Sequence, residues 1–278
     1  MSLPLRLSVQ EQMIPGETLE EKFTLAKQLG YDAIELRGRG DFAFEKRLEE
    51  FERAKQAGVV MPTECVEMSH FIGAFDDTLR RDAIENMKSQ LTTMARIGGH
   101  GVVTPAAWGM FSYRLPPFTP PRTPEEDHDI LIAVLTELGE HAQKVGTHLL
   151  LEPLNRYEDH MINTMARAKE LCDEVGLDSL GIVADVYHMN IEEDDLRNSI
   201  LASKDRLKHV QLGDSSRYQP GTGHVDWQTI LGALIDIEYS GTMALECRLR
   251  GEPEVALRDA ARFMREQWQR ALDTKGKE

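Results

Sequence analysis

The chain has 278 residues, is 41% hydrophobic, and carries 32 Lys and Arg against 47 Asp and Glu, a formal net charge of −15. This length fits one barrel-sized domain, and the acidity argues against nucleic acid or an anionic membrane as a main partner. No apolar run approaches the roughly 18 residues of a membrane span, and the first residues lack a secretory signal. The three scattered cysteines fit a reducing cytoplasm.

Short β-rich runs alternate along the chain with long amphipathic stretches, the pattern of repeated strand–helix units. Eight such runs match the strand count of a (β/α)8 barrel, so we expect a single barrel domain over residues 1–278. The expected strands are Leu5–Gln10, Ala33–Arg37, Val59–Val66, Gly101–Ala106, His148–Glu152, Gly181–Asp185, Leu207–Gln211 and Thr242–Glu246.

Helices are expected between these strands, and the last of them should end near residue 270. Glycines follow several helical stretches, where the left-handed conformation that ends a helix favours glycine. These glycines are Gly30, Gly58, Gly99 and Gly146. The expected helices include Thr18–Gln28, Glu45–Gln56, Thr78–Ile97, Glu125–Lys144, Asp226–Ile237 and Pro253–Gln269.

A proline-rich stretch, RLPPFTPPRTP (Arg114–Pro124), is the longest irregular insert in the chain. It follows the fourth expected strand, so it belongs to the catalytic face as a rim or lid. A plain loop stiffened by proline is the alternative that the sequence leaves open.

Four oxygen-bearing side chains each end an apolar run: Glu152, Asp185, Gln211 and Glu246. They are separated by 33, 26 and 35 residues, close to the roughly 30 residues of one strand–loop–helix unit. The ends of barrel strands converge on the catalytic face. Three carboxyl groups meeting there would repel one another unless a cation joined them, so the spacing indicates a metal enzyme.

The donor types narrow the choice of ion. Carboxylate and amide oxygens suit Mn²⁺, Mg²⁺ or Ca²⁺, whereas zinc prefers Cys or His. His209 shares a strand face with Gln211 but lies about 6.6 Å deeper, so we expect a hydrogen-bonded core histidine. Each acid taken alone could instead be a helix cap or a surface residue.

Loops after these strands add polar groups that could face a substrate. Glu158 follows the fifth expected strand, His188 the sixth and Arg217 the seventh. An ion pair between Arg217 and Asp214 is an equal alternative, and His188 could be a structural cap. The PGTG stretch after the seventh strand lacks the spacing of a phosphate-binding loop.

Three segments resemble the D-tagatose 3-epimerase family of sugar isomerases and epimerases: NRYEDHMINT (Asn155–Thr164), DVYHMNIEEDD (Asp185–Asp195) and SRYQPGTGHVDW (Ser216–Trp227). The resemblance implies a xylose-isomerase-like barrel with one divalent ion, Mn²⁺ first and Mg²⁺ or Co²⁺ as alternatives. Its ligands would be Glu152, Asp185, Gln211 and Glu246, where Gln211 replaces the family histidine. The resemblance further implies Glu152 and Glu246 as the acid–base pair, with substrate contacts from Glu158, His188 and Arg217.

The expected activity is isomerisation or epimerisation of a ketose, or of a related keto-polyol or keto acid, by proton abstraction through an enediolate. A keto-polyol dehydratase would use the same site, and an endonuclease-like metallohydrolase would use the same barrel. A non-catalytic sugar-binding barrel is disfavoured because both glutamates are present. The expected partner is a small sugar, without nucleic acid or membrane, and a homodimer or homotetramer is compatible with the sequence.

Overall fold

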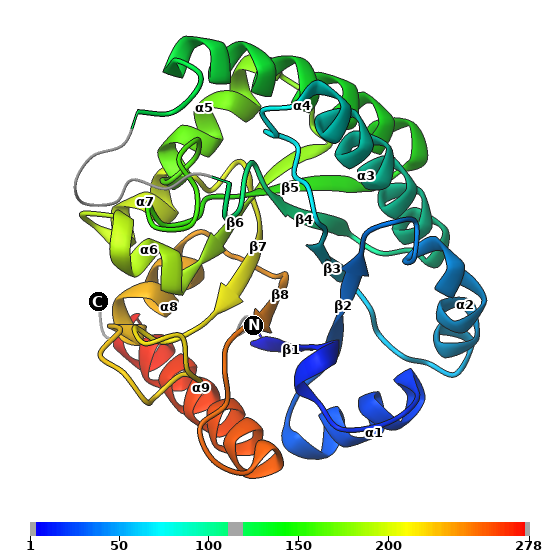
Figure 1. Ribbon diagram of the computed structural model, residues 1–278. Coiled ribbons are helices and arrows are strands. Elements are labelled where there is room, and N and C mark those ends of the chain that lie inside the picture. The colour runs from blue at the N-terminus through cyan, green and yellow to red at the C-terminus, as the bar shows by residue number, and fades with distance from the viewer. Residues whose placement is uncertain (1–3, 111–118, 276–278) are drawn as a thin grey trace.

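The computed structural model describes residues 4–110 and 119–275, and within them eight parallel strands close into a barrel in chain order. This confirms the predicted (β/α)8 architecture (Figure 1). The predicted strand positions hold to within a few residues, except that the third strand begins only after Pro62. The strands are β1 Arg6–Gln10, β2 Ala33–Arg39, β3 Thr63–Glu67, β4 Gly101–Pro105, β5 His148–Glu152, β6 Leu180–Asp185, β7 Leu207–Leu212 and β8 Thr242–Leu245.

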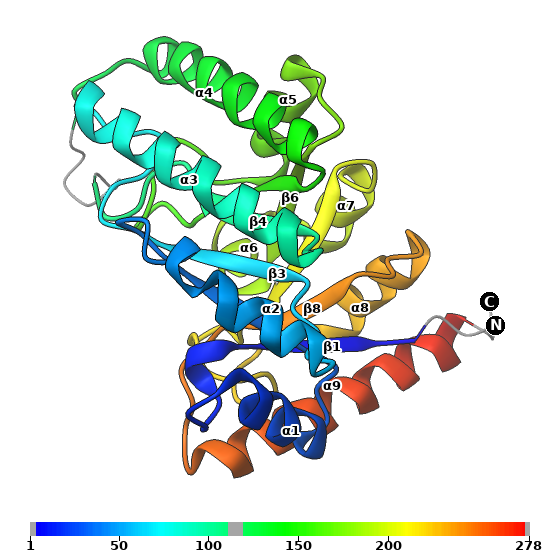
Figure 2. The same cartoon turned by 90° about the vertical axis from the view of Figure 1, so that its right-hand side faces the viewer.

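Helices cover the outside of the barrel, as the side view shows (Figure 2). None of the helices in the described ranges is long and apolar enough to cross a membrane. The α-helices are α1 Leu19–Leu29, α2 Leu48–Gln56, α3 Asp77–Ile97, α4 Pro124–Val145, α5 Met165–Val175, α6 Val186–Glu192, α7 Leu196–Ala202, α8 Trp227–Asp236 and α9 Pro253–Lys275. Two short 3-10 helices, η1 Glu11–Met13 and η2 Glu45–Arg47, complete the set.

Two predicted boundaries need correction. Helix α3 ends at Ile97 as predicted, but the glycine that caps it in the left-handed conformation is Gly98, with φ 78°, and not Gly99. Helix α9 runs to Lys275 instead of ending near residue 270. The longer helix has a packing reason, because Ala271 is buried and carries the apolar face of α9 one turn further.

The barrel wall separates two apolar layers, which follow from the alternation of strand side chains. Leu149 and Leu151 face outward into the core between strands and helices. Leu150 faces inward and packs with Val103 and Val183 inside the barrel. Full burial of one such side chain stabilises the fold by about 1.5–3 kcal/mol. The inward layer forms a floor, and it leaves the next inward positions at the strand ends for polar side chains.

Glu64 lies on the outward face of β3, because its neighbour Cys65 packs against the inner layer. Its carboxyl group is fully buried, and neither oxygen has a hydrogen-bond partner among the described residues. The side chain occupies space that only a glycine leaves free on β2: a Cβ atom added at Gly38 would lie 1.3 Å from Glu64 Oε1.

Residues 114–118 of the proline-rich stretch lie outside the described residues, so its role as a rim or lid stays a prediction. The remaining part leads into α4, where Thr123 forms a capping box with Glu126. Arg122 Nε donates to Asp127 Oδ1 at 2.6 Å, and Arg122 Nη1 donates to the carbonyl of Ala74 at 3.1 Å. These bonds tie the end of the stretch to the loop that follows β3.

Candidate active site

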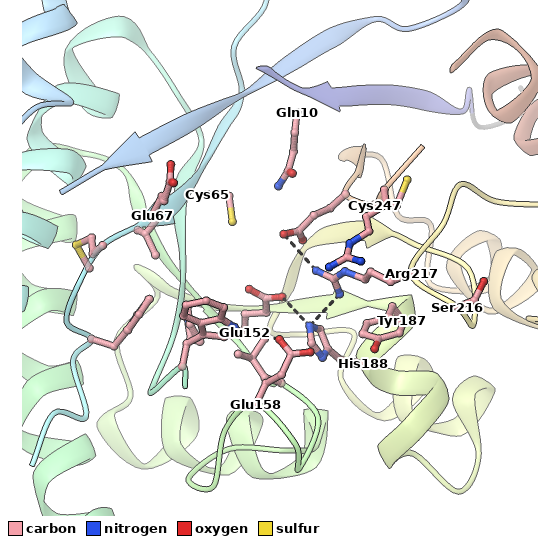
Figure 3. A pocket seen from close by; sticks show the side chains of 18 residues that line it. Gln10, Cys65, Glu67, Glu152, Glu158, Tyr187, His188, Ser216, Arg217 and Cys247 are labelled. Carbon is pink, nitrogen blue, oxygen red and sulfur yellow. Dashed lines mark hydrogen bonds and ion pairs between the residues drawn. The ribbon is translucent and has the colours of Figure 1, made fainter. Parts of the chain in front are cut away.

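A cavity of about 610 Å³ opens at the carboxyl ends of the strands (Figure 3), a volume within the usual range for small-molecule sites. One side is polar and comes from β5, β8 and the loops after β5, β6 and β7. The other side is mostly apolar and comes from β3, β4 and the loops that follow them. The polar side carries Glu152, Glu158, Tyr187, His188, Arg217 and Glu246, and the apolar side carries Val66, Met68, Phe71, Pro105 and Trp108.

Glu152 and Asp185 end their strands as predicted, and they are almost fully buried. With His188 they offer three ligand atoms that all lie within 4.8 Å of one another. The two oxygens of Asp185 have different partners. Oδ1 accepts from the backbone N–H of Tyr187 at 2.8 Å as the cap of α6, and Oδ2 lies 3.7 Å from His188 Nε2. The role of helix cap and a role in the site are therefore compatible.

Arg217 joins Glu246 to this group. Its Nη1 donates to Asp185 Oδ2 at 3.0 Å, and its Nη2 lies 3.3 Å from Glu246 Oε1. The backbone of Arg217 has a φ of 57°, which is uncommon for a residue other than glycine. Its guanidinium lies 4.6 Å from the ring centre of Tyr187. Arg217 thus points inward, and the alternative pair with Asp214 is wrong.

Asp214 instead holds the strand-seven loop together. Its carboxylate accepts from the backbone N–H of Ser215 at 2.8 Å, Gly221 at 2.8 Å and Val225 at 3.3 Å. Although burial acts to raise it, the pKa of Asp214 is lowered by these hydrogen bonds. The loop that carries Arg217 is therefore folded around a carboxylate of its own.

Two carboxyl groups of the pocket have raised pKa values. Burial raises the pKa of Glu246 to about 7, although Arg217 opposes the shift. Burial also raises the pKa of Glu152 well above its usual range, and the neighbouring charges of Glu246 and Asp185 raise it further. Carboxyl groups tuned toward neutral pH are a frequent property of acid–base catalysts.

Gln211 lies beside Asp185 in the β6–β7 register and is fully buried. Its Nε2 donates to Glu35 Oε1 at 3.2 Å. Its Oε1 has no hydrogen-bond partner among the residues that the structure describes. A buried amide oxygen without a partner is costly, and a cation in the adjacent carboxyl group cluster would satisfy it.

The imidazole ring of His188 is held in one orientation by a hydrogen bond from Asn155. The backbone N–H of Asn155 donates to His188 Nδ1 at 3.0 Å, so the neutral ring carries its proton on Nε2. Burial lowers the pKa of His188 and keeps the ring neutral. Nε2 lies 3.0 Å from Arg217 Nη1, 3.7 Å from Asp185 Oδ2 and 3.9 Å from Glu152 Oε1. His188 is therefore more than a structural cap.

Glu158 is bound on both oxygens by its surroundings. Asn155 Nδ2 donates to Oε1 at 3.0 Å, and the indole N–H of Trp108 donates to Oε2 at 3.1 Å. Trp108 contacts Phe71 edge-on, with ring centres 6.3 Å apart. Glu158 therefore links the polar side of the cavity to the aromatic side, and its predicted contact with a substrate stays a prediction.

The donor set fits a divalent cation. Glu152 and Asp185 offer ligand atoms within 4.8 Å of one another, and Arg217 joins Glu246 to Asp185. Arg217 balances one of the three negative charges of these carboxyl groups when all are ionised. Besides Gln211 Oε1, Glu246 Oε2 is buried without a hydrogen-bond partner in the described part of the chain. Hard oxygen donors of this kind suit Mn²⁺ or Mg²⁺.

A group of buried polar side chains beneath this site was not predicted from the sequence. His209 is a hydrogen-bonded core histidine, as predicted, but its partner is Glu35, with Nε2 2.6 Å from Glu35 Oε2. Glu35 also binds Gln10, whose side chain borders the cavity. The available signal was an acid within the apolar run of the second strand, at an inward position.

The family model for the xylose isomerase-like TIM barrel matches residues 23–267. A 3-dehydro-D-guloside 4-epimerase of Escherichia coli (strain K12) is 38% identical over 263 residues, which cover 94% of this chain and 99% of the relative. A D-psicose 3-epimerase of Enterocloster bolteae is 31% identical over 78% of this chain and 73% of its own. The crystal structure of a 3-keto-D-glucoside 4-epimerase from E. coli superposes with a TM-score of 0.89 at 37% identity, covering 95% of this chain and 100% of that chain.

Proposed function

Since the chain belongs to the xylose isomerase-like TIM barrel family, and the two curated relatives described above are sugar epimerases, we propose that it is a keto-sugar epimerase. It would invert the configuration of the carbon next to the ketone. A 3-dehydro sugar carries its carbonyl at carbon 3, and a common ketose carries it at carbon 2. In both kinds of relative the inverted carbon is therefore next to the carbonyl, where its proton is acidic. One pocket with an acid–base pair suffices for either substrate.

A keto glycoside is the favoured substrate class, ahead of a free ketose. The 3-dehydro-D-guloside 4-epimerase matches nearly the whole chain, whereas the D-psicose 3-epimerase matches 78% of it at lower identity. The aromatic side of the cavity supports the choice, because Phe71 and Trp108 offer an apolar surface for the part of a glycoside beyond the reacting ring.

Glu152, Asp185, Gln211 and Glu246 would hold one divalent ion, with Mn²⁺ expected first and Mg²⁺ or Co²⁺ as alternatives. The bound ion would act as a Lewis acid that lowers the pKa of the carbon acid. The support is that ligand atoms of Glu152 and Asp185 lie within 4.8 Å of each other, and that Gln211 Oε1 and Glu246 Oε2 have no hydrogen-bond partner among the described residues.

Glu246 and Glu152 are the proposed acid–base pair. One carboxylate removes the proton from the carbon beside the carbonyl, which leaves an enediolate, and the other carboxyl group returns a proton to the opposite face. The observation that carries this proposal is that both groups line one cavity and have raised pKa values. His188 Nε2–H and the Arg217 guanidinium would donate to substrate oxygens and hold the sugar in place.

Solvent isotope exchange tests the proposal. The Mn²⁺-loaded protein is incubated in D₂O with a panel of 3-keto glycosides and free ketoses, and products are identified by NMR. Deuterium on the inverted carbon of the product is expected, with faster turnover of the glycosides. Loss of water from the substrate would indicate a dehydratase. Turnover without deuterium in the product would contradict proton removal and return by the proposed acid–base pair.

A further inference from the structure

A buried carboxylate one layer below the cavity has donors on both oxygens. Glu35 Oε1 accepts from Gln10 Nε2 at 3.1 Å and from Gln211 Nε2 at 3.2 Å. Glu35 Oε2 accepts from Thr63 Oγ1 at 2.8 Å and lies 2.6 Å from His209 Nε2. Glu35 is fully buried, so its carboxylate has no contact with solvent.

The network determines which end of the Gln211 amide points away from Glu35. A side-chain amide has one end that donates and one end that accepts. An ionised carboxylate only accepts, so the end of Gln211 that meets Glu35 must be the NH₂ group. The carbonyl oxygen is then the end left without a hydrogen-bond partner among the described residues. A flipped amide would place two acceptors together below and a donor against the carboxyl cluster above.

We propose that Glu35 is a positioning residue that presents the oxygen of Gln211 as a ligand for a divalent cation. The inference rests on the proposed function only in that it takes Gln211 as one of the ligands. A neutral amide is a weak ligand unless its orientation is set beforehand, and the bond to Glu35 sets that orientation. Residues that hydrogen-bond a metal ligand commonly orient it in this way.

The groups around Glu35 support this role. Oε1 lies within hydrogen-bond distance of Gln10 and Gln211, and Oε2 lies within hydrogen-bond distance of Thr63 and His209. A carboxylate surrounded in this way acts as an acceptor toward Gln211.

The test is a double-mutant cycle on Mn²⁺ affinity, measured by the electron paramagnetic resonance signal of free Mn²⁺. Glu35→Met removes the acceptor and retains similar bulk, and it should weaken Mn²⁺ binding by about 10- to 100-fold. In a Gln211→Ala background the same substitution should cause no further loss. Equal losses in both backgrounds, or unchanged affinity in Glu35→Met, would overturn the proposal.

Two conservative variants distinguish loss of the Gln211 orientation from a general disturbance of the buried network. Glu35→Gln can keep an oxygen toward Gln10 and Gln211 while its NH₂ group donates to Thr63 and His209, so Mn²⁺ affinity should remain near that of the unmodified protein. Thr63→Val removes one donor to the same carboxylate but leaves the Gln211 bond intact, and it should also bind Mn²⁺ normally. Losses in these two variants as large as in Glu35→Met would contradict a role through Gln211.

A crystal structure of the unmodified protein with Mn²⁺ keeps the inference testable if Glu35→Met does not fold. Anomalous scattering should place the ion against Gln211 Oε1, with Nε2 still bonded to Glu35. An ion bound without Gln211 would overturn the proposal. All these readouts are independent of turnover, so a protein that binds Mn²⁺ as expected but fails the isotope test would contradict the proposed function alone.

Discussion

Carboxyl groups lie both on the floor of the barrel and at its mouth, where the cavity opens, but their pKa values shift in opposite directions. On the floor, Glu35 accepts from three side chains and contacts His209, and its pKa is lowered. At the mouth, burial raises the pKa of Glu152 and of Glu246, and one oxygen of Glu246 has no hydrogen-bond partner in the described part of the chain.

The difference shows that burial alone does not decide the charge of a carboxyl group. Desolvation penalises the ionised form in both regions, and the outcome depends on the donors that the fold supplies. The floor supplies them, and the pKa of Glu35 is lowered. The mouth supplies too few donors, so its carboxyl groups can bind a cation and exchange protons with a substrate.

The largest expected effect concerns the mouth. Glu246→Gln should lower turnover by about 10²–10⁴-fold, the usual contribution of one general acid or base. The expected measurement is the initial rate of deuterium incorporation into substrate under saturating Mn²⁺. Thermal unfolding of the metal-free protein should change little, because glutamine has the size of Glu246 and keeps an oxygen toward Arg217. Activity at the level of the unmodified protein would exclude Glu246 from the mechanism.

A divalent ion should stabilise the fold, because the carboxyl groups at the mouth have too few hydrogen-bond donors. At a free concentration of 100 times the dissociation constant, binding to the folded state adds about 2.7 kcal/mol. For a chain of this size this corresponds to a rise of about 5–10 °C in the unfolding midpoint, measurable by calorimetry with and without Mn²⁺. The rise should be smaller in Gln211→Ala. No rise with Mn²⁺, Mg²⁺ or Co²⁺ would contradict a metal site at the mouth.

Gln211 connects the two regions, so exchanging its side chain should change which metal is preferred. In Gln211→His the new ring can bind a cation through one nitrogen and donate to Glu35 through the other. Imidazole favours late transition metals, and a rise in Zn²⁺ or Co²⁺ affinity relative to Mn²⁺ on the order of tenfold is expected. Competition titrations measure the preference, with Gln211→Ala as the control. An unchanged preference would argue against Gln211 as a ligand.

The smallest effect is expected on the outer wall, where Glu64 is buried without partners and takes no part in the site. Burial, and then the charge of Glu35, raises its pKa well above the usual value. The folded chain therefore holds a proton that the unfolded chain loses above about pH 4.3, so this group lowers stability as pH rises. Glu64→Gln should raise the free energy of unfolding at pH 8 by on the order of 1 kcal/mol.

Urea unfolding at several pH values measures this difference, which should shrink toward pH 4. Turnover should not change, because the side chain faces away from the cavity. A constant difference across the pH range would mean that Glu64 does not titrate as expected.

The sequence predicted the barrel and the mouth because both follow from regular signals. Apolar runs ending at residues 152, 185 and 211 mark strand ends, and the convergence of strand ends is a property of the fold. Glu246 follows the last residue of β8 directly, which is close enough for the same inference.

Other features left no such signal. Glu35 is an acid inside an apolar run, which can equally be an exposed strand position, and its partner His209 is 174 residues away in sequence. The link from Arg217 to Asp185 and Glu246 depends on a left-handed backbone conformation that composition does not reveal. Contacts made by loop geometry and by distant strands required the folded chain.

The packing of Glu64 over Gly38 also constrains how this barrel can change during evolution. A single change of Gly38 to alanine would bring a methyl carbon to 1.3 Å from Glu64 Oε1, a distance that requires the glutamate to move. A smaller side chain at position 64 would remove this obstacle and make the same alanine acceptable. The order of the two substitutions therefore matters, and lineages with a side chain at position 38 are expected to have lost the glutamate first.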